Sequence, residues 1–82
     1  MISYAPFWET LKNSQESTYT LVNKYGISSS TIYRFRHGRP VSSETLNTLC
    51  HILDCRIDQL IEYIPHPDDQ KTLKKKQGAE MV

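Results

Sequence analysis

The stretch "STYTLVNKYGISSSTIYRFRHG" at residues 17–38 decides how this chain folds. Ser17 and Ser28 are of a type that caps helices, because a serine hydroxyl accepts a hydrogen bond from an unpaired backbone N–H of the first turn. Gly26 and Gly38 suit helix ends, because glycine adopts the left-handed conformation without steric cost. The stretch therefore predicts two short helices separated by a turn of about three residues.

The second of these helices has two dissimilar faces. Ile32 and Phe35, with Ile27 just ahead of them, form an apolar side that suits a core. The opposite side is polar or basic, and residues 26–43 contain three arginines and no acidic residue although the net charge of the chain is only +1. Helices joined by so short a turn cross steeply, as in a helix-turn-helix. Because local potential steers association more than total charge does, the basic side suits an anionic partner; an ordinary solvated face is the alternative.

Outward from this stretch the helical period continues. Pro6, Phe7, Trp8 and Leu11 predict a first helix over about residues 6–13. Ser42 predicts the start of a fourth helix, whose apolar side consists of Leu46, Leu49, Cys50 and Leu53. A fifth, short helix would contain Ile57, Leu60 and Ile61. Trp8 is compatible with either a core or an interface position.

The two ends of the predicted helical region are compatible with β-structure. "MISY" begins the chain and "EYIP" occupies residues 62–65, so the two segments could pair as a two-strand ribbon supported by the helices. From Pro65 onward the composition changes, with two prolines followed by "DDQ" and "KTLKKKQGAE". We therefore expect one small domain at residues 1–66 and a flexible basic tail at residues 67–82.

Several classes of protein are disfavoured. No apolar run approaches the roughly 20 residues of a membrane helix, and "MISYAPFW" lacks the basic and apolar regions of a signal peptide, so we expect a cytoplasmic protein without a membrane partner. Cys50 and Cys55 suit reduced thiols in a core, and with His51 they lack the spacing of a zinc site, so no metal or cofactor is expected. Without a P-loop or a nucleophile elbow, an enzyme is the weakest interpretation.

The order and spacing of these signals over about residues 6–64 resemble the Cro/C1-type (Xre-like) helix-turn-helix family, particularly its short single-domain bacterial members with "ILDC" and a final "EYIP". The resemblance implies an all-α, five-helix, lambda-repressor-like DNA-binding domain, with an N-terminal strand at residues 1–5 and the helix-turn-helix at about residues 17–37. It also implies that the third helix enters the major groove of double-stranded DNA. The residues that carry it are Leu21, Gly26, Ile27, Ser28, Ile32, Gly38, Leu46, Leu49, Leu53 and Leu60.

The resemblance, carried over position by position, implies a set of DNA contacts. Ser29, Ser30 and Arg34 would lie at base edges, and Arg34 is chemically best suited because a guanidinium can bind guanine with two hydrogen bonds. For Ser29 and Ser30 the alternative is a purely local role in starting the helix. Ser28, Thr18 and Arg39 would meet the sugar-phosphate backbone. The full predicted set is Thr18, Ser28, Ser29, Ser30, Tyr33, Arg34, Arg36, His37 and Arg39.

Two departures from the family pattern stand out. Many relatives pair an arginine of the first helix with a glutamate near the end of the third, and those positions are Leu11 and Arg36 here. Both halves of the pair are missing together, which avoids an isolated buried charge and leaves Arg36 available for phosphate. Arg56 replaces the usual serine or threonine cap of the last helix.

The sequence thus predicts a sequence-specific DNA-binding transcriptional regulator, expected to be a repressor. A two-fold homodimer on a palindromic site is expected, because one module makes few base contacts. Candidate self-association residues are Tyr4, Ile61, Tyr63 and Ile64, and no effector site is evident. The alternative is an antitoxin-like interaction module whose bundle or tail binds a protein partner.

Overall fold

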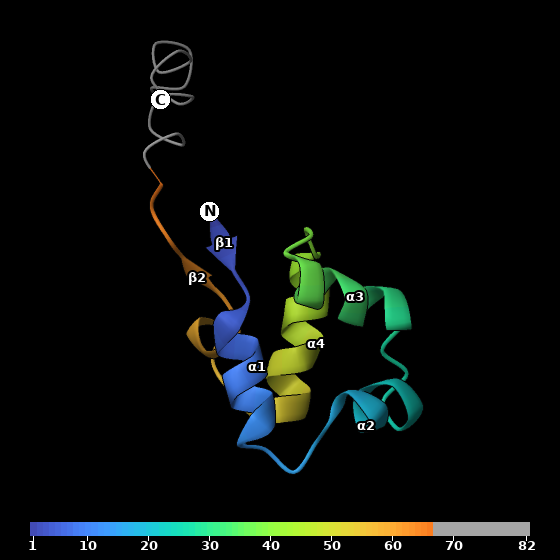
Figure 1. Cartoon of the computed structure of the whole chain (residues 1–82). Coiled ribbons are helices and arrows are strands. Elements are labelled where there is room, and N and C mark those ends of the chain that lie inside the picture. Colours follow the sequence, from blue (N-terminus) through green and yellow to red (C-terminus); the bar gives the residue numbers. More distant parts are fainter. Residues whose placement is uncertain (67–82) are drawn as a thin grey trace.

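The computed structural model describes residues 1–66; the predicted tail at residues 67–82 lies outside the described residues. Four α-helices and a two-strand ribbon make up the fold (Figure 1). In chain order the elements are β1 (Ile2–Ser3), α1 (Ala5–Lys12), α2 (Thr18–Asn23), α3 (Ser29–His37), α4 (Ser43–Leu53), the short 3₁₀ helix η1 (Ile57–Gln59) and β2 (Glu62–Tyr63).

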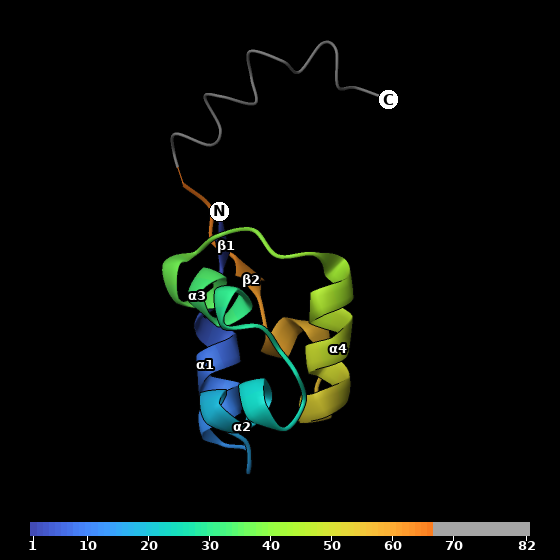
Figure 2. The same cartoon turned by 90° about the vertical axis from the view of Figure 1, so that its right-hand side faces the viewer.

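The helices enclose one apolar core. Helices α1 and α4 stand on two sides of the domain, η1 contacts both of them, and α2 and α3 cover one side (Figures 1 and 2). The ring centroids of Phe7 and Phe35 are 4.4 Å apart. This contact joins α1 to α3 at the centre of the core. Ile32 and Phe35 are both buried, as the apolar side of this helix predicts. The core consists of Tyr4, Phe7, Leu11, Leu21, Ile32, Phe35, Leu49 and Leu60.

Serine hydroxyls cap three helices at the predicted positions. Ser17 Oγ accepts from the N–H of Thr20 at 3.3 Å, Ser28 Oγ from that of Thr31 at 3.1 Å, and Ser42 Oγ from that of Thr45 at 3.1 Å. Each bond satisfies one backbone donor that the first helical turn leaves unpaired. Local chemistry therefore sets where α2, α3 and α4 begin.

The turn between α2 and α3 is longer than predicted. Helix α2 ends at Asn23, so five residues, 24–28, separate it from α3. Tyr25 lies in this turn, and its hydroxyl donates a 2.7 Å hydrogen bond to Glu16. Gly26 and Gly38 have φ angles of 75° and 67°, the left-handed conformation expected of both glycines.

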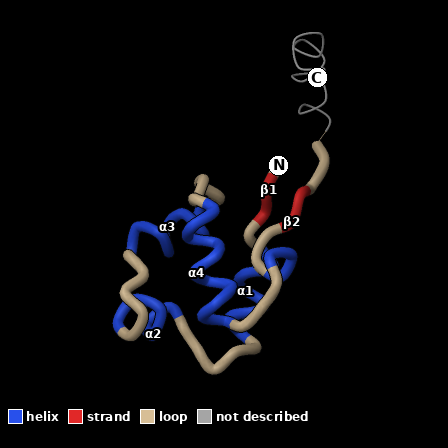
Figure 3. Tube along the Cα trace, turned by 180° about the vertical axis from the view of Figure 1, so that it is seen from behind, coloured by secondary structure: helices blue, strands red, loops and turns tan. Residues whose placement is uncertain are grey.

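The predicted ribbon is present and joins the two ends of the described chain (Figure 3). The strands are antiparallel, with Ile2 opposite Tyr63 and Ser3 opposite Glu62. Next to these pairs, the N–H of Ile64 donates to the carbonyl of Met1 at 2.8 Å. Strand β1 is shorter than the predicted strand at residues 1–5. The ribbon nevertheless places the C-terminal end of the domain next to the start of α1.

The fifth predicted helix is only a 3₁₀ turn. The Arg56 side chain does not cap it; instead the Arg56 N–H donates to Gln59 Oε1 at 2.9 Å, and the guanidinium pairs with Asp58 at 2.7 Å. Leu60 is buried, and β2 begins at Glu62. After this turn the chain enters β2, which ends the helical segment. No helix within residues 1–66 combines the length and apolar character that crossing a membrane requires.

Candidate nucleic-acid interface

Helix α3 presents its polar side outward because its apolar side is anchored in the core. Ile32 and Phe35 are buried, whereas Tyr33, Arg34 and His37 are exposed. When α2 and α3 face the viewer, the N-terminal end of α3 projects forward and α1 lies behind it (Figure 2). An extended polymer could therefore reach this end of α3 together with the neighbouring residues of α2.

The basic side chains of this region are exposed and lack acidic partners. Arg34, Arg36 and Arg39 form no ion pair with any residue in the range 1–66, whereas Arg56 is held by Asp58 on η1. Glu16, in the loop before α2, accepts a hydrogen bond from Tyr25, which lowers the pKa of its carboxyl. The positive charge at the end of α3 is therefore not neutralised by a salt bridge within the described chain.

The serines at the start of α3 differ in availability. Ser28 Oγ lies 3.0 Å from Ser30 Oγ and 2.9 Å from Thr31 Oγ1, in addition to its capping bond. Ser29 is exposed and makes no side-chain hydrogen bond with a described residue. The local role predicted as the alternative for Ser30 thus has a structural basis, whereas the Ser29 hydroxyl is open to a ligand.

Tyr33 and His37 form a stacked pair on the outer side of α3. Their ring centroids are 4.1 Å apart with an interplanar angle of 28°, and His37 Nδ1 lies 3.0 Å from the Tyr33 carbonyl oxygen. Tyr33 therefore stacks on His37. The pair places two exposed rings one turn apart, beside Arg34, and restricts the rotamers of both.

The first residues of α2 and α3 share a hollow of about 350 Å³. It brings Thr18 and Ser29 together, two residues predicted to contact DNA from different helices. Tyr19 also lines it and is 72% exposed, yet the sequence analysis did not select this residue. The sequence signal for Tyr19 was its position two residues before Leu21. The two side chains are about 200° apart around the helix, so Tyr19 points outward when Leu21 is buried. The remaining lining residues are Val22, Asn23 and Ile32.

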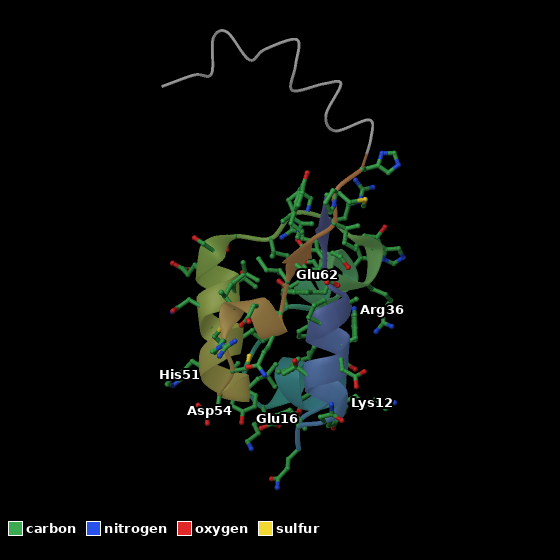
Figure 4. All side chains as sticks on the ribbon, turned by 90° about the vertical axis from the view of Figure 1, so that its left-hand side faces the viewer. Lys12, Glu16, Arg36, His51, Asp54 and Glu62 are labelled. Carbon is green, nitrogen blue, oxygen red and sulfur yellow. The ribbon has the colours of Figure 1, made fainter. Side chains whose placement is uncertain are left out.

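Arg36 is set apart from the other predicted contacts. Its guanidinium carbon lies 4.8 Å from the centre of the Trp8 ring, on the side of α3 that faces α1 (Figure 4). Leu11, where the resemblance implies the arginine of a buried pair, is part of the apolar core. The remaining eight predicted residues lie on α2, on α3 or in the turns that flank α3.

Features elsewhere in the domain offer no comparable site. Cys50 and Cys55 are free thiols packed against the core, and burial together with neighbouring Cys50 raises the pKa of Cys55 from 9.0 to about 11. His51 extends outward from α4 (Figure 4). Within residues 1–66, no three His, Cys, Asp or Glu side chains are grouped so that they could hold a metal ion.

Comparisons with known proteins point to the same region. A model of the Cro/C1-type HTH DNA-binding domain family matches residues 7–66. Among solved structures, the crystal structure of the transcriptional regulator VanUg, Form II, is similar with a TM-score of 0.70 and 28% sequence identity, over 79% of this chain and 87% of that chain. A comparison with curated proteins finds no significant match. The matched segment includes every residue of the candidate interface.

Proposed function

Since this chain belongs to the Cro/C1-type HTH DNA-binding domain family, we propose that it is a transcriptional regulator that reads double-stranded DNA with α3. The observation that carries the proposal is the pair of exposed arginines, Arg34 and Arg39, which lack acidic partners within residues 1–66 and adjoin a capped helix. A rigid basic surface of this kind attracts phosphate through Coulomb interaction and counterion release.

The side chains divide into base-reading and phosphate-binding groups. Arg34 reads a guanine through its O6 and N7 atoms, for which the guanidinium fork is well matched. Ser29 contacts an adjacent base, and the Tyr33–His37 stack borders the same base pairs. Thr18, Ser28 and Arg39 hold the sugar-phosphate backbone, and Tyr19 extends this contact along the edge of α2.

Residues 1–66 act as the DNA-binding domain, and the protein binds as a two-fold dimer to a palindrome with half-sites about 10 bp apart. A single α3 makes only a few base contacts, and a dimer doubles that number. The regulatory mode is repression by occupation of the operator in the cytoplasm. A role in catalysis is not part of this proposal, because the chemistry of the exposed arginines and hydroxyls suits binding.

The decisive test is selection of random duplex DNA by the purified protein at about 0.1 M salt, where non-specific phosphate contacts no longer dominate. We expect a palindromic sequence to emerge. On that site, Arg34→Ala should cost about 1–3 kcal/mol and relax the preference at one position, whereas Arg39→Ala should weaken all sequences alike and reduce the salt slope by about one. Arg56→Ala is the matched control. An unenriched pool would contradict specific regulation.

A second candidate function is antitoxin-like binding of a protein partner. The observation in its favour is the apolar exposure of the ribbon, where Ile2, Tyr63 and Ile64 are all about half exposed. Tyr63→Ser and Ile64→Ser would then abolish capture of a co-expressed partner while Arg34→Ala leaves capture unchanged. The opposite pattern, with loss only of DNA binding in Arg34→Ala, favours the regulator.

A further inference from the structure

We propose that Trp8 and Arg36 are positioning residues for α3: their stack fastens the C-terminal end of the recognition helix to α1, and Arg36 acts through Trp8 and not through a DNA phosphate. The effect on DNA affinity rests on the proposed function. The stack itself can be tested without DNA.

One indole holds two consecutive residues of α3. The Arg36 guanidinium lies over the Trp8 ring at 4.8 Å, and Trp8 Nε1 donates a 3.4 Å hydrogen bond to the carbonyl of Phe35. The indole also contacts Phe7 of α1: the two ring centroids are 4.8 Å apart, with an interplanar angle of 73°. Half-buried Trp8 therefore connects the core of α1 to both the backbone and a side chain of α3.

The hydrogen bond from Trp8 supplies a donor to a carbonyl at the C-terminal end of α3. The last four carbonyls of a helix lack intrahelical partners. Here the Arg34 carbonyl accepts from the N–H groups of Gly38 and Arg39, whereas the Phe35 carbonyl accepts from the indole. A side chain of α1 thus completes the hydrogen bonding of the recognition helix, which ties the orientation of α3 to α1.

The position of Arg36 also separates it from the bases. Successive residues of an α-helix are rotated by about 100°, so Arg36 lies roughly 200° from Arg34 around α3. Arg34 and Arg36 therefore point to opposite sides, and Figure 4 shows Arg36 beside α1. A guanidinium favours this place because its flat face stacks on an indole and because a cation near a helix C-terminus is stabilised by the helix dipole.

A stack that only positions α3 leads to a specific pattern of affinities. Arg36→Gln should weaken binding to the selected operator by about 2- to 5-fold, the range expected for one cation–π contact. Trp8→Phe should weaken it further, because it also deletes the hydrogen bond to the Phe35 carbonyl. The double variant should be hardly weaker than Trp8→Phe alone, because the contact that Arg36→Gln removes is already lost. Arg36→Lys should resemble Arg36→Gln, since it keeps the charge but loses the flat stacking surface.

Salt dependence separates positioning from phosphate binding. The slope of log affinity against log salt should stay at the wild-type value in Arg36→Gln, because no phosphate contact is lost. Arg39→Gln is the positive control, with a slope reduced by about 0.9, and Arg56→Gln removes the same charge away from α3. A slope reduced by about 0.9 in Arg36→Gln, or additive effects of the Arg36 and Trp8 variants, would overturn the proposal.

The same stack has an optical readout, because Trp8 is the only tryptophan of the chain. Arg36→Gln should shift the Trp8 emission to the red and raise its quenching by acrylamide, whereas Arg56→Gln should change neither. Arg36 is exposed, so its substitution is not expected to unfold the domain. Unchanged emission in Arg36→Gln overturns the stack while leaving the proposed function intact. A shifted emission in a protein that selects no DNA supports the stack and removes the proposed function.

Discussion

The hydroxyl of Tyr4 donates a 2.8 Å hydrogen bond to the backbone carbonyl of Arg39, 35 residues further along the chain. The Tyr4 ring also packs on Phe35, with centroids 4.6 Å apart. These contacts tie the residue before α1 to the loop that follows α3, the loop from which Arg39 extends. The N-terminal segment therefore supports the candidate interface although it contributes no residue to it.

Tyr4→Phe should lower the free energy of unfolding by about 1 kcal/mol, because it deletes one hydrogen bond and keeps the buried ring. For a domain of this size that loss corresponds to a decrease in Tm of roughly 4–8 °C, measurable by circular dichroism. Tyr63→Phe is the control, since this side chain is 56% exposed. Equal shifts in the two variants would show that the Arg39 contact contributes nothing.

Ser28 and Ser42 form a matched pair, because each caps its helix with a 3.1 Å bond to the N–H three residues later. Replacing either serine by alanine should cost about 1 kcal/mol in urea unfolding. Only Ser28→Ala should also weaken operator binding, by about 2- to 10-fold, through loss of one hydrogen bond to phosphate. Equal losses of DNA affinity in both variants would assign the effect to helix stability alone.

Ionisation of Cys55 should make the fold less stable in alkali. The folded protein raises the pKa of this thiol from 9.0 to about 11, so it holds the proton more tightly than the unfolded chain does. The corresponding stability is complete below pH 9 and is lost as the pH rises from 9 towards 11. Urea unfolding across this range should show a smaller decline for Cys55→Ala than for the wild type. Parallel curves would contradict the raised pKa.

The carboxyl of Glu16 should titrate below its usual range. Hydrogen bonds from Tyr25, the larger cause, and from Thr20 lower its pKa from 4.5. The associated stability is present above the unfolded value and is lost as the pH falls through the folded value. Tyr25→Phe should raise the pKa towards 4.5 in an NMR titration. A Glu16 pKa unchanged by Tyr25→Phe would show that the hydroxyl does not stabilise the carboxylate.

Helix starts could be predicted because each signal is local. The hydroxyls of Ser17, Ser28 and Ser42 meet N–H groups only three residues away, and these bonds form as soon as the first turn does. Gly38 likewise ends α3 through its own backbone conformation, with φ at 67°. The short η1 turn was harder to foresee, because its length depends on where β2 pairs with β1 at the other end of the chain.

The candidate interface was predictable in composition and less so in arrangement. In the sequence alone, the basic segment without acidic residues and the apolar side formed by Ile32 and Phe35 indicate an outward polar face. The same reasoning predicted a DNA contact for Arg36, whose guanidinium lies over the Trp8 ring, and did not select the exposed Tyr19. The stack of Arg36 on Trp8 and the hollow shared by Thr18 and Ser29 each join residues of different helices. The spacing of residues within one helix therefore could not predict either contact.

The sequence by itself determined the four α-helices, the serine caps of three of them, the pattern of burial and the family, because these depend on residue types repeated at short intervals. Only the tertiary structure decided what the side chains of α3 face. Trp8 meets Arg36, and Tyr4 meets Arg39, across 28 and 35 residues. Such contacts arise when distant helices pack in one geometry, and the free energy that selects this geometry is distributed over the whole core.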